Sequence, residues 1–276
     1  MIIDGHAHAC GEFLHAENVV RILDANRVDK IVLVPGEMNS EKSYYLPELA
    51  RAFPSRDVVS WTNALTKLAI SLTGAARHIG DGNHYVHSFV QAYPDRIIQF
   101  YWVMLHRPDI LQEIEAHYNE WHFQGIKFHQ CWETFTVRSA LFEAVADFAT
   151  RHHLPIFIHV GSKQEVIALI DFIRHHPQTR IIVGHLFGLE LYIQSGLNFE
   201  NVYFEISSPQ LISLQRLNKA LRHFGAQKIV LGSDTPYGKD SLRLNLERVR
   251  ALPISDEEKD SILGRNLHDL LGLGAP

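Results

Sequence analysis

The chain has 276 residues, and its 26 lysines and arginines against 31 aspartates and glutamates give a formal net charge of −5. This balance excludes the basic surface of a nucleic-acid-binding protein, and the 46% of hydrophobic residues excludes a disordered chain. Histidine is abundant (18) and cysteine scarce (2), so we expect no disulfide framework, and we expect imidazole and carboxylate groups to hold any bound metal.

The first residues contain neither a basic segment nor an apolar stretch long enough for a signal peptide. No window of the sequence approaches the roughly 18 consecutive apolar residues of a membrane-spanning helix. We therefore expect a cytoplasmic protein that binds neither a membrane nor nucleic acid.

Eight short apolar runs predict β-strands. Ile31-Val32-Leu33-Val34 is typical, because a brief run rich in β-branched residues indicates a strand buried on both faces. The predicted strands are 1–3, 30–34, 96–104, 125–128, 155–160, 180–184, 201–206 and 228–231. Apolar residues at helical spacing lie between most of them and predict helices over 18–25, 61–77, 84–93, 108–117, 139–151 and 164–174, with 256–263 and 266–271 closing the chain.

Eight strands that alternate with helices over about 250 residues predict an α/β fold, a (β/α)8 TIM barrel, here one domain over 1–276. A doubly wound open sheet is the alternative, but no glycine-rich phosphate loop follows the first strand. The alternation is interrupted at 36–95, between the second and third strands. We expect this segment to be an insertion over one mouth of the barrel.

His6 and His8 lie two residues apart at the end of the first predicted strand. Successive side chains of a strand alternate between its faces, so both imidazoles should point to the barrel interior. Two imidazoles that converge from one strand form half of a tetrahedral metal site. Two ordinary surface histidines are the alternative, since this spacing also arises by chance in a histidine-rich chain.

Three further strand ends carry polar residues. His159 stands at the C-terminal tip of the fifth strand, His185 follows the sixth, and Asp234 follows the eighth. Active sites of TIM barrels lie at this end of the strands. A chance origin would require several coincidences at one level of the barrel, so the positions favour a common site.

Several segments, taken in order, resemble the amidohydrolase superfamily, and within it the metal-dependent TIM barrels that include the aminocarboxymuconate semialdehyde decarboxylase-like enzymes. The resemblance implies that His6, His8, His159 and Asp234 bind one divalent metal, usually zinc. It also implies that His185 stands beside the metal as a proton carrier or substrate-orienting group. The segments that carry it are Asp4-Gly5-His6-Ala7-His8, Gly125-Ile126-Lys127-Phe128-His129, Ile158-His159, Gly184-His185, Gly232-Ser233-Asp234-Thr235-Pro236 and the tail 264–273.

Lys127 leaves the number of metals open. In binuclear amidohydrolases a carbamylated lysine of the fourth strand bridges two metals, and His185 would then be a ligand too. Lys127 and His129 lie two apart on the fourth strand, so their side chains point the same way. We favour one metal, with Lys127 or His129 in contact with an anionic substrate.

The expected function is a metal-dependent hydrolase in which a metal-activated water attacks an ester, lactone or amide carbonyl of a small molecule. Asp234 would accept the proton of the water and deliver it to the leaving group. A non-oxidative decarboxylase with the same ligands is the first alternative, and His185 would then help to protonate the carbon. A barrel that binds a metal or ligand without catalysis is the second. A homodimer is compatible with the resemblance, although nothing in the sequence identifies an interface.

Overall fold

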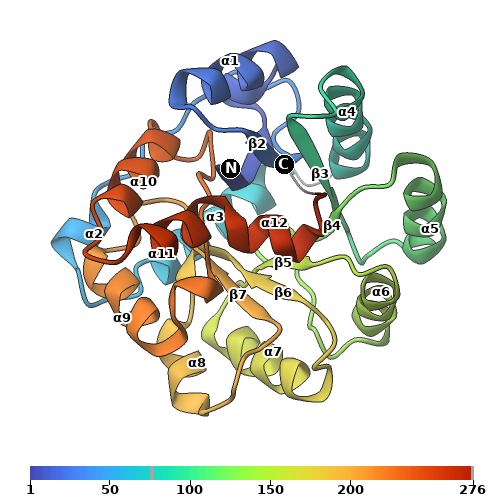
Figure 1. Ribbon diagram of the computed structural model, residues 1–276. Coiled ribbons are helices and arrows are strands. Elements are labelled where there is room, and N and C mark those ends of the chain that lie inside the picture. The colour runs from blue at the N-terminus through green and yellow to red at the C-terminus, as the bar shows by residue number, and fades with distance from the viewer. Residues whose placement is uncertain (75–77, 275–276) are drawn as a thin grey trace.

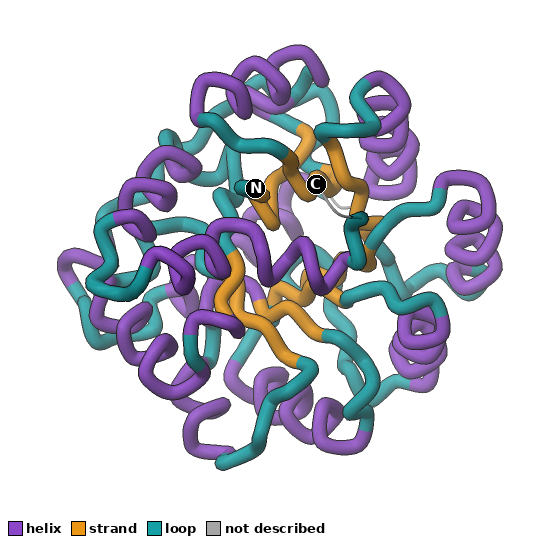
Figure 2. Tube along the Cα trace, in the orientation of Figure 1, coloured by secondary structure: helices purple, strands orange, loops and turns teal. Residues whose placement is uncertain are grey.

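In the computed structural model, which describes residues 1–74 and 78–274, eight parallel strands pair in chain order. Backbone hydrogen bonds from Gly5 N to Leu231 O (2.9 Å) and from His8 N to Thr235 O (2.8 Å) join the first strand to the end of the last. The fold is therefore the predicted (β/α)8 TIM barrel (Figures 1 and 2). Its strands are β1 (Ile3–Ala9), β2 (Lys30–Pro35), β3 (Ile97–Trp102), β4 (Gly125–His129), β5 (Ile156–His159), β6 (Ile181–Val183), β7 (Val202–Glu205) and β8 (Ile229–Val230).

Helices surround the strands, as Figure 2 shows. Ser139 and Ser162 begin two of them, because their hydroxyl oxygens accept hydrogen bonds from backbone N–H groups of the first turn. Among the described residues, no helix is long and apolar enough to cross a membrane. The helices are α1 (Ala16–Asn26), α2 (Leu49–Ala52), α3 (Val59–Thr73), α4 (Ile79–Ala92), α5 (Ile110–Trp121), α6 (Ala140–Arg151), α7 (Lys163–His175), α8 (Leu189–Ser195), α9 (Leu214–Phe224), α10 (Ser241–Arg250), α11 (Asp256–Asp260) and α12 (Asn266–Leu271).

The first strand was predicted too short. Residues 1–3 were expected, but β1 runs from Ile3 to Ala9 and includes both histidines. The apolar criterion failed here because the residues that face the barrel interior are polar and the others are small. At the C-terminus the two predicted closing helices are joined by a π-helical turn (Ser261–Arg265) into one continuous element. The last three residues of the helix predicted over 61–77 lie outside the described residues.

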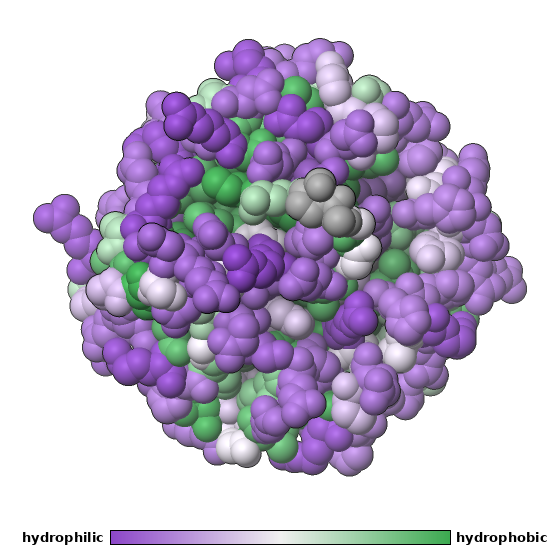
Figure 3. Space-filling model, viewed as in Figure 1, coloured by the Kyte–Doolittle hydropathy of each residue, from purple (hydrophilic) through white to green (hydrophobic). Residues whose placement is uncertain are grey.

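Two buried apolar clusters hold the barrel together. The larger one lies between the strands and the surrounding helices. The smaller one includes Ile3, Phe100 and Phe157 of the strands, and it continues onto Leu267 and Leu270 of α12. Figure 1 shows α12 crossing this end of the barrel, and Figure 3 shows the same face covered mainly by hydrophilic residues. The N-terminal end of the strands is therefore plugged, and the opposite end is left for a site.

The segment between β2 and β3 has two parts. Helix α4 packs against β2 and β3, the place of an ordinary crossover helix of the barrel. The preceding part, which includes α2 and α3, lies at the C-terminal mouth, where Val59 and Thr62 line the same cavity as His8 and Asp234. Asp57 fixes the start of α3, because its carboxylate accepts hydrogen bonds from Arg216 (3.0 Å) and from Gly188 N (2.8 Å). That 36–95 is an insertion into one domain stays a prediction.

Because α12 covers the N-terminal end of the barrel, shortening one of its buried side chains should strongly destabilise the protein. Leu267 is 1% exposed, so Leu267→Ala should lower the free energy of unfolding by about 2–5 kcal/mol, the range for a buried leucine. Urea unfolding followed by circular dichroism measures this change. Leu214→Ala is the control, since Leu214 is 53% exposed and should change the free energy by about 0.5 kcal/mol or less. If the two variants unfolded at the same urea concentration, the role assigned to α12 would be contradicted.

Candidate metal and catalytic site

The two histidines of β1 face the barrel interior side by side, as predicted. Their ring centroids are 5.0 Å apart, and both side chains are buried. His8 Nδ1 donates to the carbonyl oxygen of Pro35 (2.7 Å), so Nε2 keeps its lone pair. His6 Nδ1 is buried and, among the described residues, has no hydrogen-bond partner. Each ring therefore turns one nitrogen toward the carboxylate of Asp234.

Asp234 is held against these rings by the backbone. Its N–H donates to the carbonyl oxygen of His6 (2.7 Å), and its carboxylate Oδ1 lies 3.4 Å from His8 Nε2 and 3.8 Å from His6 Nδ1. Burial alone would raise the pKa of the Asp234 carboxyl, but the neighbouring His185, His8 and Lys127 lower the pKa below its ordinary value. Asp234 is therefore an ionised carboxylate beside two imidazole nitrogens.

His159 stands at the tip of β5, as predicted, and Asn63 of α3 sets its tautomer. The amide nitrogen of Asn63 donates to Val160 O (2.9 Å), so its Oδ1 must accept the bond from His159 Nε2 (2.7 Å). His159 Nδ1 is then the nitrogen with a lone pair, and it accepts from His185 Nε2 at 3.0 Å. A residue of the segment over the mouth thus orients a barrel histidine.

His185 is linked on its other side to the end of β7. Its Nδ1 lies 2.9 Å from Ser207 Oγ, and its backbone N–H donates to Glu205 Oε2 (3.1 Å). Burial is the main reason why the pKa of His185 falls to about 4, so the ring is neutral at pH 7. Burial likewise raises the pKa of Glu205 to about 8. Glu205 is fully buried and anchors the turn that carries Ser207.

Lys127 and His129 point to the same side of β4, as predicted. His129 stacks between Trp102 (5.5 Å between centroids) and His159 (3.9 Å). Lys127 Nζ lies 2.8 Å from His6 Nε2, and burial lowers the pKa of this lysine to about 7. His129 lines the cavity, whereas Lys127 is fully buried beneath it.

A cavity of about 240 Å³ lies over these strand ends. The barrel contributes histidines, Asp234 and Tyr237, while the segment over the mouth supplies most of the remaining wall. Glu37 accepts a hydrogen bond from Tyr44, and both belong to that wall. The lining residues are His8, Glu37, Tyr44, Leu46, Val59, Thr62, Asn63, Thr66, Ala69, Ile70, His129, Trp132, His159, His185, Leu211, Asp234 and Tyr237.

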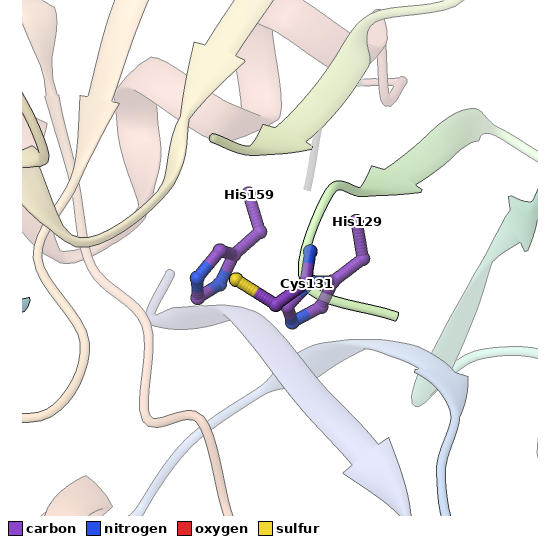
Figure 4. Close-up of side chains that lie close together, drawn as sticks. All are labelled: His129, Cys131 and His159. Atoms are coloured by element: carbon purple, nitrogen blue, oxygen red, sulfur yellow. The ribbon is translucent and has the colours of Figure 1, made fainter. Parts of the chain in front are cut away.

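The predicted ligands fall into neighbouring groups rather than one. The potential ligand atoms of His6, His8 and Asp234 lie within 4.8 Å of one another, and those of His6, His185 and Glu205 form a second such group. His159 belongs to a third group, with His129 and Cys131 (Figure 4). A hydrogen bond between His159 Nδ1 and His185 Nε2 (3.0 Å) links the third group to the second.

Sequence reasoning missed two residues that orient the site. Ser207 could have been found, because it lies two residues after Glu205 at a strand end and so shares its face. Asn63 carries no such signal, because it lies in a helix that is not part of the strand alternation. Glu205 is fully buried at the end of β7 and does not line the cavity.

A family model described as amidohydrolase matches residues 3–273. The chain belongs to the amidohydrolase family. No curated protein matches it. Many solved structures share the fold, among them 2,6-dihydroxybenzoate decarboxylase from Rhizobium, which is 14% identical with a TM-score of 0.69 and 99% of each chain covered.

Two other solved amidohydrolase-like barrels show the range of proteins with this fold. A probable 2-pyrone-4,6-dicarboxylic acid hydrolase from Acinetobacter baumannii, with citric acid bound, is 14% identical with a TM-score of 0.69, and 99% of each chain is covered. A dihydroxybenzoic acid decarboxylase from Polaromonas, with bound manganese and 2-nitroresorcinol, is 15% identical with a TM-score of 0.67, and covers 100% of this chain and 98% of its own. The fold is therefore shared by decarboxylases and hydrolases.

The hydrogen bonds of Glu205 predict a stability effect in this amidohydrolase. Glu205→Ala leaves two buried backbone N–H groups, those of His185 and Ser207, without their acceptor, so the free energy of unfolding should fall by about 2–6 kcal/mol. Chemical unfolding measures the loss. Glu200→Ala, at an exposed position before the same strand, should be nearly neutral and serves as the control. A neutral Glu205→Ala would show that these bonds do not stabilise the turn.

Proposed function

We propose that this amidohydrolase is a metal-dependent hydrolase that cleaves an ester, lactone or amide of a small molecule in the cavity. One observation carries the proposal: the ligand atoms of His6, His8 and Asp234 converge within 4.8 Å where the barrel meets the cavity. The resemblance and the family match support a metal at this position. Zinc is the metal that we expect.

The residues present fit a divalent cation. His6 Nδ1 is a buried nitrogen for which the described part of the chain supplies no hydrogen bond, and such an atom calls for a partner. His8 is held by Pro35 in the manner of a metal-binding histidine, whose second nitrogen donates to a backbone carbonyl. The Asp234 carboxylate supplies the negative charge. We propose that these three residues hold the metal together with His159, whose Nδ1 carries the lone pair.

In the proposed reaction the protein transfers one proton from the attacking water to the leaving group. A bound divalent metal would act as a Lewis acid on the carbonyl and generate a nucleophile from water near pH 7. Asp234 would take the proton of the attacking water at Oδ1 and pass it to the leaving oxygen or nitrogen. His185 would orient the substrate, while Ser207 fixes the imidazole ring at Nδ1. Asn63 would keep His159 in the tautomer that places the lone pair on Nδ1.

A non-oxidative decarboxylase is the second candidate, and His185 is the observation that favours it. A decarboxylase must deliver a proton to carbon, and His185 lies in a buried chain from Glu205 through Ser207. Two of the compared barrels are decarboxylases of dihydroxybenzoates. A decarboxylase substrate with a further carboxylate, besides the one that it loses, would need a lysine or arginine to pair with it. None of the described side chains that line the cavity is a lysine or arginine, and this favours hydrolysis. Lys127, beneath the lining, and His129 remain the proposed contacts for an anionic substrate.

A substrate panel tests the proposal. The zinc-loaded protein would be assayed on lactones, esters, amides and hydroxybenzoates, with proton release and carbon dioxide release followed in parallel. We expect protons to be released from a lactone or ester without carbon dioxide. Carbon dioxide release from a benzoate alone would establish the decarboxylase instead. Asp234→Asn should abolish turnover in either case, so it controls for contaminating esterases.

Metal content tests the ligands independently of activity. His6→Ala and Asp234→Ala should each remove the metal, measured by elemental analysis after zinc loading, with the circular dichroism spectrum unchanged. His175→Ala, at an exposed histidine of α7, is the control and should keep one equivalent. Full metal content in either site variant would refute the ligand assignment. Two equivalents in the native protein that fall to one in Lys127→Ala would refute the single metal.

A further inference from the structure

Helix α3 exposes a stripe of large apolar side chains. Trp61, Leu65, Leu68 and Leu72 are 45%, 68%, 58% and 79% exposed. Their spacing of four, three and four residues places them on one face of the helix, as at the contact positions of a coiled coil. Phe53 extends the stripe, because its ring packs edge-on against Trp61 at 5.0 Å and is itself 43% exposed. We refer to these five residues as the α3 stripe.

The other face of α3 belongs to the active-site cavity. Thr62, Asn63 and Thr66 line the cavity, together with the apolar Val59, Ala69 and Ile70 of the same helix. A helix on the surface of a globular protein usually turns its large apolar side chains toward the core, whereas those of the α3 stripe point outward. The α3 stripe therefore contributes nothing to the core beneath it, and contiguous apolar surface of this kind marks an interaction site.

We propose that the α3 stripe binds the same stripe of a second copy of this chain, with the two α3 helices antiparallel about a two-fold axis. The positions are self-complementary. An axis midway between residues 66 and 67 places Leu65 opposite Leu68 of the second copy and Trp61 opposite Leu72. A two-fold interface requires one surface that complements itself, and the order of the stripe meets this requirement.

The exposed area is close to what a stable dimer needs. At about 200 Å² per large side chain, the exposed fractions of the α3 stripe amount to roughly 600 Å² per copy, against about 800 Å² per partner in a standard interface. The polar rim that surrounds such a patch accounts for the difference. This area is also at the upper end of the largest apolar patch found on a typical monomer.

Charge favours a second copy over a lipid surface. Lys67 is the only charged residue of α3, and its Nζ lies beside Gly161, 3.0 Å from where a Cβ atom of that residue would stand, rather than on the α3 stripe. Membrane-surface helices carry several lysines and arginines on their polar face, to contact anionic lipids. The polar face of α3 instead lines the cavity and has threonines and an asparagine there.

The proposed contact stabilises the wall of the active site. Asn63, on the inner face of α3, fixes the tautomer of His159, and it lies two residues from Leu65. Pairing of the outer faces would hold this helix in place over both cavities. The contact concerns assembly alone and stands whether the enzyme is a hydrolase or a decarboxylase.

Sedimentation velocity from about 1 to 100 μM tests the proposal. We expect the native chain at twice its 31.5 kDa mass, and Leu65→Glu with Leu68→Glu at the mass of one chain with an unchanged circular dichroism spectrum. Ile167→Glu is the matched control, because Ile167 is 53% exposed on α7 and should leave the dimer intact. A monomeric native chain over this range overturns the proposal, and so does a dimer that survives the double substitution. Binding of the monomer to phosphatidylcholine–phosphatidylserine vesicles would assign the stripe to lipid instead.

Cross-linking tests the antiparallel geometry. The native cysteines, Cys10 and Cys131, are buried, so only introduced thiols should react. In the double variant Leu65→Cys, Leu68→Cys, mild oxidation should give a covalent dimer, since residue 65 of one copy faces residue 68 of the other. Each single variant should cross-link at least tenfold more slowly. Rapid cross-linking of Leu65→Cys alone would indicate parallel helices and overturn the two-fold arrangement.

Discussion

The closure of the barrel and the assembly of its site depend on the same backbone hydrogen bonds. The carbonyl oxygen of His6 accepts from Ser233 N (3.1 Å) and Asp234 N (2.7 Å), and these bonds join the first strand to the loop after the last. They bring Asp234 to the two histidines of β1, whose rings the strand already points inward. The close approach requires Gly5, where a Cβ atom would lie 2.6 Å from Leu231 O. A barrel that failed to close there would lose its site as well as its sheet.

Hydrogen bonds from the surrounding scaffold orient the histidine rings of the site. Pro35 binds His8 at Nδ1, and Asn63 binds His159 at Nε2, so each of these contacts with the scaffold places the lone pair of the ring on the opposite nitrogen. Such outer contacts fix ring orientation and raise ligand basicity. His6 differs, because Nε2 forms a hydrogen bond with Lys127 and no described residue forms one with Nδ1. The unpaired polar atom is buried, which is costly unless a ligand satisfies it. This cost is the physical reason to regard the interior as a binding site rather than a polar core.

The sequence predicted the parts of the site that follow from local geometry. Alternation along a strand is a local rule, so the shared faces of His6 with His8 and of Lys127 with His129 were correct, as was His159 at the tip of β5. The extent of β1 was wrong, because its interior residues are polar and an apolar scan passes over them. Asn63 and Ser207 were missed as positioning residues. Their roles come from contacts between distant segments, which no periodicity encodes.

Helix α3 illustrates why a segment over a barrel mouth breaks the usual amphipathic pattern. The space beneath it is a cavity of about 240 Å³ that must hold a substrate, so its inner face carries hydrogen-bonding groups such as Asn63 beside the apolar Val59 and Ile70. Most of the large apolar residues of the helix then lie on its outer face. Left in water, Leu65 and Leu72 would gain nothing from folding, and the helix would depend on its anchored start at Asp57. Covering the outer face supplies the missing packing energy, and it does so without filling the cavity that the inner face serves.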